Sequence, residues 1–410
     1  MKANINRIQQ DIEILASFTS SPGFGVTRLP FTPEDLSAKK YLTQEMLNAG
    51  LNVTEDSVGT IFGKSPGVHH NEATIMIGSH YDTVKYGGAF DGVAGIVAGI
   101  EVARVLNENG ALSNYPIEVV AMNDEEGVRF STGMLSSRAI VGTLSENELR
   151  SAVDEDGMCM LFAMEKMGIF PDLKKAKRGK KLIKAYLEMH IEQGPVLEQQ
   201  GKGLGVVTDI VGITVYDVII QGKAGHAGTT PMNLRRDALH AAAKSIIELY
   251  SVINTSSEDL IGTVGQLKVF PGAPNVIPES VSFTIDLRSS NAEAPKDFLM
   301  KFQKKIKLIK NEHHVDISIR KTFDVKPVAL SPNITNLLKI AAAKLDFSTL
   351  LMSSGAGHDA MVMAQHVPSG MIFVPSKNGV SHTPDEFTDY KHIQNAVEVL
   401  INAVISISDM

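Results

Sequence analysis

The sequence is poor in the residues that mark secreted and thiolate-metal proteins. Among 410 residues it has one cysteine, Cys159, and no tryptophan. A lone cysteine cannot form an internal disulfide and lacks the partner thiols of a cysteine metal site. Proteins of the reducing cytoplasm have this pattern, so we expect a cytoplasmic localisation.

Long hydrophobic runs and an excess of basic charge are also missing. The most apolar stretch, residues 92–106, is interrupted by Glu101 and Arg104 and is too short to span a bilayer. The first fifteen residues mix charged and apolar side chains, unlike a signal peptide. With 39 basic and 46 acidic side chains the net charge is -7, so we expect neither nucleic acid nor a membrane among the partners.

The composition that remains is that of a folded globular protein. Hydrophobic residues make up 43% of the chain and charged residues 21%, and the length allows two to four domains. Apolar runs at residues 73–79, 117–122, 185–189 and 371–374 predict buried strands, and residues 91–106 predict a helix that begins at Asp91. This alternation predicts an α/β fold, with a mixed, mostly parallel sheet and helices on both faces.

The middle of the chain has a different pattern. Residues 234–253 and 296–310 predict helices, and residues 215–220, 262–270, 281–287 and 315–319 predict strands. We interpret residues 212–325 as an inserted α+β domain, so that residues 1–211 and 326–410 form the main domain. The basic run at residues 174–184 predicts a solvated loop, because no aromatic residues interleave it.

Acidic and histidine residues follow the predicted strands, where α/β sheets gather their chemistry. His80 and Asp82 come after the first strand, and Glu125 and Glu126 after the second. Asp91 precedes the predicted helix, where an N-cap that needs no metal is the alternative. For His80 and Asp82 the alternative is a surface His-x-Asp pair. For Glu125 and Glu126 the alternative is a solvated acidic turn.

Two further histidines, His190 and His382, also follow strand candidates. Each alone is typical of a loop or of a satisfied core residue. Together, the acids and three histidines suit two divalent ions bridged by one carboxylate.

Eight segments carry a family resemblance: GSHYDTV, GGAFDGVAGI, NDEEGVRF, MHIEQGPVLE, GHAGTTPM, PNVIPESVSFTIDLR, SGAGHDA and GVSHTPDE. In this order they resemble the amidase and carbamoylase branch of the M20 metallopeptidase family, which includes allantoate amidohydrolase and N-carbamoyl-L-amino acid hydrolase. The resemblance covers essentially the whole chain. It implies the fold of the dinuclear-metal exopeptidases, with the inserted domain as a lid and dimerisation domain.

The resemblance also implies a role for each matching residue. One metal ion would be held by His80, Asp91 and His190. The second would be held by Asp91, Glu126 and His382, with Asp91 as the bridge. Asp82 would orient His80, and Glu125 would be the general base.

The substrate contacts implied by the resemblance are spread along the chain. Asn275 and Arg288 would bind the carboxylate side of a small substrate, although a turn-capping Asn and a surface Arg paired with Asp286 are the alternatives. Gln193 and the turn at residues 355–359, which includes Gly357, would line the pocket. His226 would reach the site of the partner subunit in a homodimer and stabilise the oxyanion.

The activity implied is metal-dependent hydrolysis of a linear C–N bond in an N-carbamoyl amino acid or an allantoate-like substrate, with release of ammonia and carbon dioxide. An aminoacylase or dipeptidase of the same fold and a non-catalytic dimeric binding protein are the alternatives. Zinc, manganese, cobalt and nickel all suit the ligands. Residues 213–215 read Ile-Thr-Val where many amidases of this branch have Gln-Arg-Arg, which leaves the substrate open.

Overall fold

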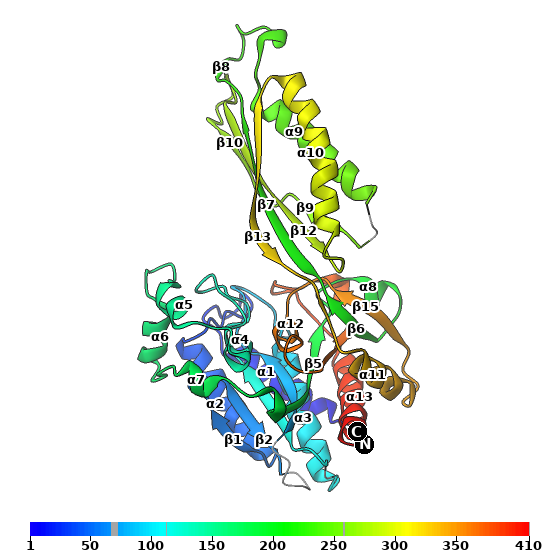
Figure 1. Ribbon diagram of the computed structural model, residues 1–410. Helices are drawn as coiled ribbons and strands as arrows, with labels where there is room; N and C mark the ends of the chain where they lie inside the picture. Colours follow the sequence, from blue (N-terminus) through cyan, green and yellow to red (C-terminus); the bar gives the residue numbers. More distant parts are fainter. Residues whose placement is uncertain (67–72, 112, 257–258, 410) are drawn as a thin grey trace. The chain divides into compact units, whose positions relative to one another are not determined.

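The chain forms two compact units. The computed structural model describes residues 1–66, 73–111, 113–256 and 259–409. Unit 1 comprises Met1–Thr208 and Ala329–Met410, and unit 2 comprises Asp209–Val328 (Figure 1). Unit 2 is therefore an insertion between two segments that fold together.

Unit 1 is built on a mixed sheet with a parallel centre. In the described residues its strands follow the order β1 (Asn52–Glu55), β2 (Ile61–Lys64), β4 (Ile117–Met122), β3 (Thr74–His80), β5 (Ile183–Ile191), β16 (Ser369–Val374), β6 (Leu204–Ile210) and β14 (Val328–Ala329), and β15 (Thr349–Ser354) pairs with β6. The pairs β4–β3, β3–β5 and β5–β16 are parallel. The pairs β2–β4 and β16–β6 are antiparallel. The predicted α/β class is confirmed.

Strand alternation in β5 separates the two faces of this sheet. Ala185, Leu187 and Met189 are buried in the core formed with α3 (Val93–Glu108) and α13 (Tyr390–Ser408). Glu188 points to the opposite face, where it accepts a hydrogen bond from Ala360 N in α12 (Asp359–Met363). The other helices of unit 1 are α1 (Ile5–Ser17), α2 (Pro33–Asn48), α4 (Leu135–Val141), α5 (Glu146–Ser151), α6 (Met160–Lys166), α7 (Leu173–Ala176), α8 (Val196–Gln199) and α11 (Pro332–Ala343).

The start of α3 differs from the prediction in a way that matters for the site. The helix begins at Val93, and its N-cap is Gly92, with φ of 65°, rather than Asp91. Glycine adopts this left-handed conformation without the penalty that a Cβ brings. The carboxylate of Asp91 is therefore not used as a helix cap and is available for other partners.

In its described residues, unit 2 packs two α-helices against an antiparallel sheet. Its antiparallel sheet has the order β10 (Leu267–Phe270), β12 (Ser280–Ser289), β7 (Gly212–Gln221) and β13 (Asp316–Val325), with β9 (Ile261–Thr263) also paired with β12. The buried face of β12 packs with α9 (Ala238–Asn254) and α10 (Ala294–His313) in a separate core (Figure 1). A short ribbon, β8 (Gly225–His226) with β11 (Val276–Ile277), completes the unit.

Three local predictions were wrong. The predicted strand at residues 262–270 is two strands, because the chain leaves the sheet between Thr263 and Leu267. The helix predicted from residue 234 begins at Ala238, because Asp237 caps it by accepting from the N–H groups of Leu239 and His240. The basic run at residues 174–184 contains the end of α7, a 3-10 turn and the start of β5 rather than a continuous loop.

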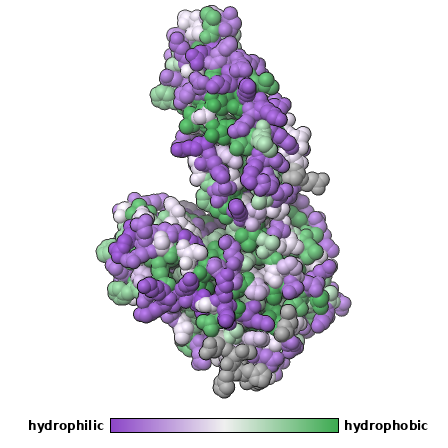
Figure 2. All heavy atoms as spheres, in the orientation of Figure 1, coloured by the Kyte–Doolittle hydropathy of each residue, from purple (hydrophilic) through white to green (hydrophobic). Residues whose placement is uncertain are grey.

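Polar and apolar side chains share the surface of both units. Figure 2 shows hydrophobic residues interspersed with hydrophilic ones on the visible face of each unit. Within the described part of the chain, no helix combines the length and apolar character needed to cross a membrane.

Candidate metal centre

The candidate ligands in unit 1 gather at the carboxyl ends of neighbouring parallel strands. His80 is the last residue of β3, and His190 is the penultimate residue of β5. Glu125 and Glu126 follow β4, which pairs with β3 up to His80 and Met122. Adjacent parallel strands end at one edge of a sheet, so short apolar strands are enough to bring these residues together.

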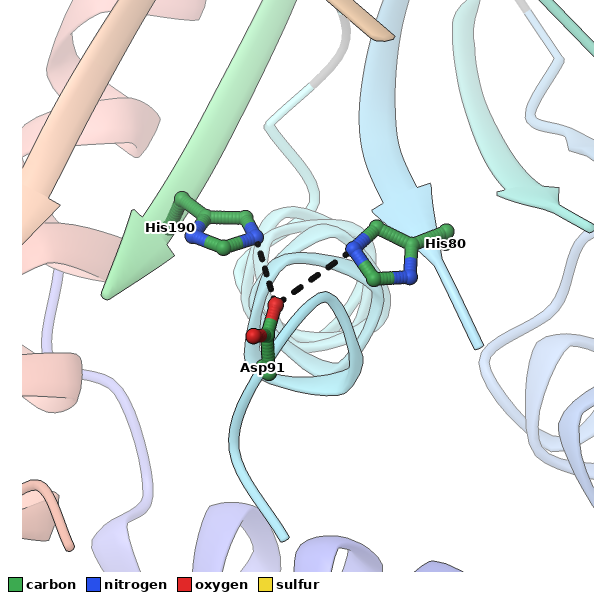
Figure 3. Close-up of side chains that lie close together, drawn as sticks. All are labelled: His80, Asp91 and His190. Atoms are coloured by element: carbon green, nitrogen blue, oxygen red, sulfur yellow. Dashed lines mark ion pairs between the residues drawn. The ribbon is translucent and has the colours of Figure 1, made fainter. Parts of the chain in front are cut away.

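Asp91 joins the two histidines. Its Oδ1 atom lies 3.5 Å from Nε2 of His80 and 3.2 Å from Nε2 of His190 (Figure 3). All three side chains are buried. Two imidazoles and one carboxylate oxygen at such distances form a group that can hold one divalent ion.

The second oxygen of Asp91 faces a different set of side chains. Oδ2 lies 3.0 Å from Nε2 of His382, and the same nitrogen lies 3.4 Å from Oε1 of Glu126. Asp91, Glu126 and His382 form a second group with ligand atoms close enough to share an ion. One carboxylate thus belongs to two groups, one through each oxygen, as a bridging ligand requires.

The second ring nitrogens of the buried histidines have partners of their own. Nδ1 of His80 lies 3.1 Å from the carbonyl oxygen of Asp82, and Nδ1 of His190 lies 2.9 Å from that of Ile191. A proton on Nδ1 that is donated to these acceptors leaves Nε2 as an acceptor directed at the cluster, where Nε2 of His190 also accepts from Gly92 N at 3.2 Å. The donor chemistry therefore fits divalent transition ions.

Asp82 connects His80 to the acidic segment after β4. Its Oδ1 accepts from Glu125 N at 3.1 Å, its Oδ2 accepts from Glu126 N at 3.1 Å, and Oδ1 lies 3.6 Å from Nδ1 of His80. Oε2 of Glu125 in turn lies 3.8 Å from Nε2 of His80. One buried carboxylate therefore positions the candidate base, its neighbour and a candidate ligand.

The electrostatics of the cluster are dominated by its buried acids. Burial raises the pKa of Glu125 well above its usual range, and burial together with Asp91 raises the pKa of Glu126 to about 7. A hydrogen bond to Asp91 raises the pKa of His382 to about 9. Buried carboxylates whose pKa is raised by burial and by neighbouring acids mark a place where cations are favoured.

The candidate pocket residues of unit 1 lie beside this cluster. Gln193, which has φ of 58°, donates from Nε2 to Asp91 Oδ2 at 2.8 Å, and the same nitrogen lies 3.2 Å from His382 Nε2. A Cβ on Gly357 would lie 3.0 Å from the terminal methyl of Met134, whose backbone N–H donates to the carbonyl of Glu125. Gly357 therefore lies against the segment that carries Glu125.

The remaining candidates belong to unit 2. His226 is exposed, pairs in register with Val276, and lies near Asn275, whose carbonyl accepts from Ala227 N. Arg288 lies on β12 and makes an ion pair with Asp286, with Nε and Oδ1 3.2 Å apart. This pair is the alternative considered from the sequence, and a substrate carboxylate would have to compete with it.

Three further residues lie near the cluster, and only His358 was predicted to take part in the site, within the pocket turn at residues 355–359. Glu188 and His358 form a buried group with His190, and Glu386 contacts the Asp91 segment. Glu188 could have been recognised, because it lies two residues before His190 on a strand and therefore shares its face. The contact of Glu386 links distant segments and leaves no local signal.

Comparison with known proteins identifies the family. The model of peptidase family M20/M25/M40 matches residues 76–406. The chain belongs to this family. Among its M20 relatives, the N-carbamoyl-L-amino-acid amidohydrolase of Paenarthrobacter aurescens is 42% identical over 404 residues, covering 98% of each chain.

Two further M20 proteins extend the comparison. The allantoate amidohydrolase of Escherichia coli (strain K12) is 34% identical, covering 96% of this chain and 95% of its own. A crystal structure of an amidase of the hydantoinase/carbamoylase family from Burkholderia multivorans superposes with a TM-score of 0.94 at 32% identity, covering 100% of this chain and 99% of its own. The similarity therefore includes both units.

Proposed function

We propose that this protein is a dinuclear-metal amidohydrolase that cleaves a linear C–N bond in an N-carbamoyl amino acid or an allantoate-like substrate. The observation that carries the proposal is the position of Asp91, with one oxygen toward His80 and His190 and the other toward His382. The activities named for two relatives that match almost the full length, an N-carbamoyl-L-amino-acid amidohydrolase and an allantoate amidohydrolase, support cleavage of the same type of bond.

The chain's own residues would share the chemical work. Divalent ions held by the two ligand groups would supply Lewis acidity at the scissile carbonyl and favour deprotonation of water. Glu125 would accept the proton of the attacking water and deliver it to the leaving nitrogen. Its raised pKa suits both steps, since a base of ordinary carboxylate pKa re-donates a proton poorly near neutrality. Asp82 would hold the backbone of Glu125 in place.

Hydrolysis of a carbamoyl substrate has simple products. Water adds to the carbonyl, the C–N bond to the amino acid breaks, and the amino nitrogen takes the proton from Glu125. The carbamate released decomposes to ammonia and carbon dioxide. Ammonia therefore reports on this activity and is absent from the cleavage of an acyl-amino acid, which releases a free amino acid and a carboxylate.

The substrate carboxylate would be bound by Arg288 and Asn275. Arg288 would exchange its contact with Asp286 for a bidentate contact with the substrate, and Asn275 would add an amide hydrogen bond. Gln193 and Gly357 would line the pocket from unit 1.

A homodimer formed through unit 2 would complete the site. The segment that carries His226 is held by Arg235, which donates to the carbonyl groups of Ala227 and Thr230. His226 of one subunit would stabilise the oxyanion in the other, a contribution of about 3 kcal/mol. Unit 2 has exposed apolar side chains to bury in such a contact: Met232, Leu234, Ile247, Leu267, Phe270 and Leu308. The ions would be zinc, manganese, cobalt or nickel. The protein would be cytoplasmic, a location that the single Cys159 favours.

The decisive experiment is a substrate panel on protein reconstituted with each of these metals. We expect ammonia release from N-carbamoyl-L-amino acids or allantoate, and a loss of about 100-fold or more in kcat for Glu125→Gln with metal content retained. Release of free amino acid from acyl-amino acids or dipeptides, without ammonia from carbamoyl compounds, would instead identify an aminoacylase or dipeptidase. Binding without turnover of any compound would identify a binding protein.

A further inference from the structure

Glu386 is a buried carboxylate placed between two segments that carry candidate ligands. Its side chain is 5% exposed, and it lies in the loop before α13. One segment, residues 87–91, ends with Asp91, and the other, residues 381–386, carries His382. Glu386 and Asp91 are 295 residues apart in the sequence.

Each oxygen of Glu386 serves one of these segments. Oε1 accepts from the backbone N–H groups of Phe90 at 3.0 Å and Asp91 at 3.1 Å. Oε2 accepts from the Ser381 hydroxyl at 2.7 Å and from His382 N at 3.3 Å. Four donors converge on one carboxylate, an arrangement that a neutral amide cannot reproduce because half of its polar atoms donate.

The packing around Glu386 leaves it little freedom. A Cβ on Gly88 would lie 2.2 Å from Oε1 of Glu386, so the backbone approaches as closely as glycine allows. His382 has φ of 59°, a left-handed conformation that is unfavourable for a residue with a Cβ. The hydrogen bond from its N–H to Glu386 helps to hold this conformation.

We propose that Glu386 is a positioning residue that sets the separation between Asp91 and His382 and so determines the affinity of the second cation group. The inference rests on the dinuclear centre proposed above. The group of His80, Asp91 and His190 is also fixed by β3 and β5, whereas His382 lies in a loop and depends on Glu386. The two cations should therefore respond differently when Glu386 is changed.

The test compares cobalt(II) binding by wild type and Glu386→Gln, followed by calorimetric titration and by the visible absorption of the bound ions. The glutamine oxygen can still accept from Phe90 and Asp91, while its NH₂ group faces the N–H of His382. We expect the affinity for the second ion to fall about 10- to 100-fold and that for the first to stay within threefold, since outer-shell partners typically contribute this much.

Two further variants serve as a second test and as a control. Ser381→Ala removes the hydroxyl that donates to Glu386 and lies 3.3 Å from Asp91 Oδ2, with little risk to folding, and we expect a smaller loss of affinity for the same ion. Glu101→Gln is the matched control, because Glu101 is also buried in unit 1 and accepts a backbone N–H, from Asn4 at 2.8 Å, at a point outside the cluster. This control should lower the melting temperature and leave both cobalt affinities unchanged.

The outcomes separate this inference from the proposed function. Wild-type protein that binds no cobalt would overturn the dinuclear centre and the inference together. If the wild type binds two ions and Glu386→Gln weakens the affinity for both equally or for neither, the positioning role alone is overturned. If Glu386→Gln does not fold, an unchanged affinity of Ser381→Ala for the second ion overturns the positioning role.

Discussion

The most informative single substitution in the site is Asp82→Asn. Asp82 is buried, and its two oxygens each accept one backbone N–H at 3.1 Å, from Glu125 and Glu126. Asparagine keeps the shape but replaces one oxygen with an NH₂ group. That group must face an N–H donor, so one charge-assisted hydrogen bond is lost and a buried donor is left without an acceptor.

The size of the effect follows from these contacts. Losing a hydrogen bond to a charged group and leaving a buried donor unpaired costs about 2–3 kcal/mol. Both affected amides belong to the segment of the proposed base, so we expect the cost to appear in the transition state. At 1.4 kcal/mol for each factor of ten, kcat/KM should fall about 30- to 150-fold.

The assay is ammonia release under metal-saturated conditions, with circular dichroism to confirm folding. Asp56→Asn is a control for the loss of a largely buried carboxylate outside the cluster, because Oδ1 of Asp56 accepts from the backbone N–H groups of Val58 at 3.0 Å and Thr60 at 2.9 Å, between β1 and β2. We expect this control to keep kcat/KM within about twofold. A folded Asp82→Asn protein with activity within threefold of wild type would refute the reasoning, as would an equal loss in the control.

Three further predictions concern stability and assembly. Gly78→Ala should lower the free energy of unfolding by about 3 kcal/mol in a denaturant titration, because a Cβ would lie 1.9 Å from the carbonyl oxygen of Val120 on the neighbouring strand; an unchanged midpoint would contradict this close approach. Burial and the neighbouring His240 lower the pKa of His313 below 6.5, so its contribution to stability is complete above that pH and is lost as pH falls through it. The melting temperature should therefore drop between about pH 7.5 and pH 5.5, and less in His313→Gln; equal drops would count against the buried neutral histidine. Mixing inactive His226→Ala with an inactive metal-ligand variant should restore part of the activity through mixed dimers, and failure to complement would exclude a shared site.

The parts of the fold that could be predicted depend on local patterns. The centre of the main sheet was predictable because β3, β4, β5 and β16 are short, almost wholly apolar runs bounded by polar residues. The break between β9 and β10 was not, because residues 262–270 keep enough apolar character to look continuous. The start of α9 was misplaced because Leu234 extends the apolar pattern beyond the true cap at Asp237.

The site residues could also be predicted only where a local pattern marks them. Polar residues at strand ends pointed to His80, Glu126 and His190, and the structure brings these side chains into overlapping groups with Asp91 and His382. The cap interpretation of Asp91 was wrong, since Gly92 takes that position. Glu386 could not be identified, because its partners near Asp91 come together only when the sheet is folded.

The bridge between Asp91 and His382 also constrains how the protein can be made. On the ribosome, the segments that carry His80, Asp91 and His190 emerge first, and all of unit 2 must follow before His382 appears. The ligands of the first proposed cation group are therefore all synthesised before unit 2, whereas the second proposed group has its last ligand only when about nine-tenths of the protein has been made. The strand β16 and the helix α13, which pack with β5 and α3, also follow unit 2, so the proposed centre cannot be complete until synthesis is nearly finished.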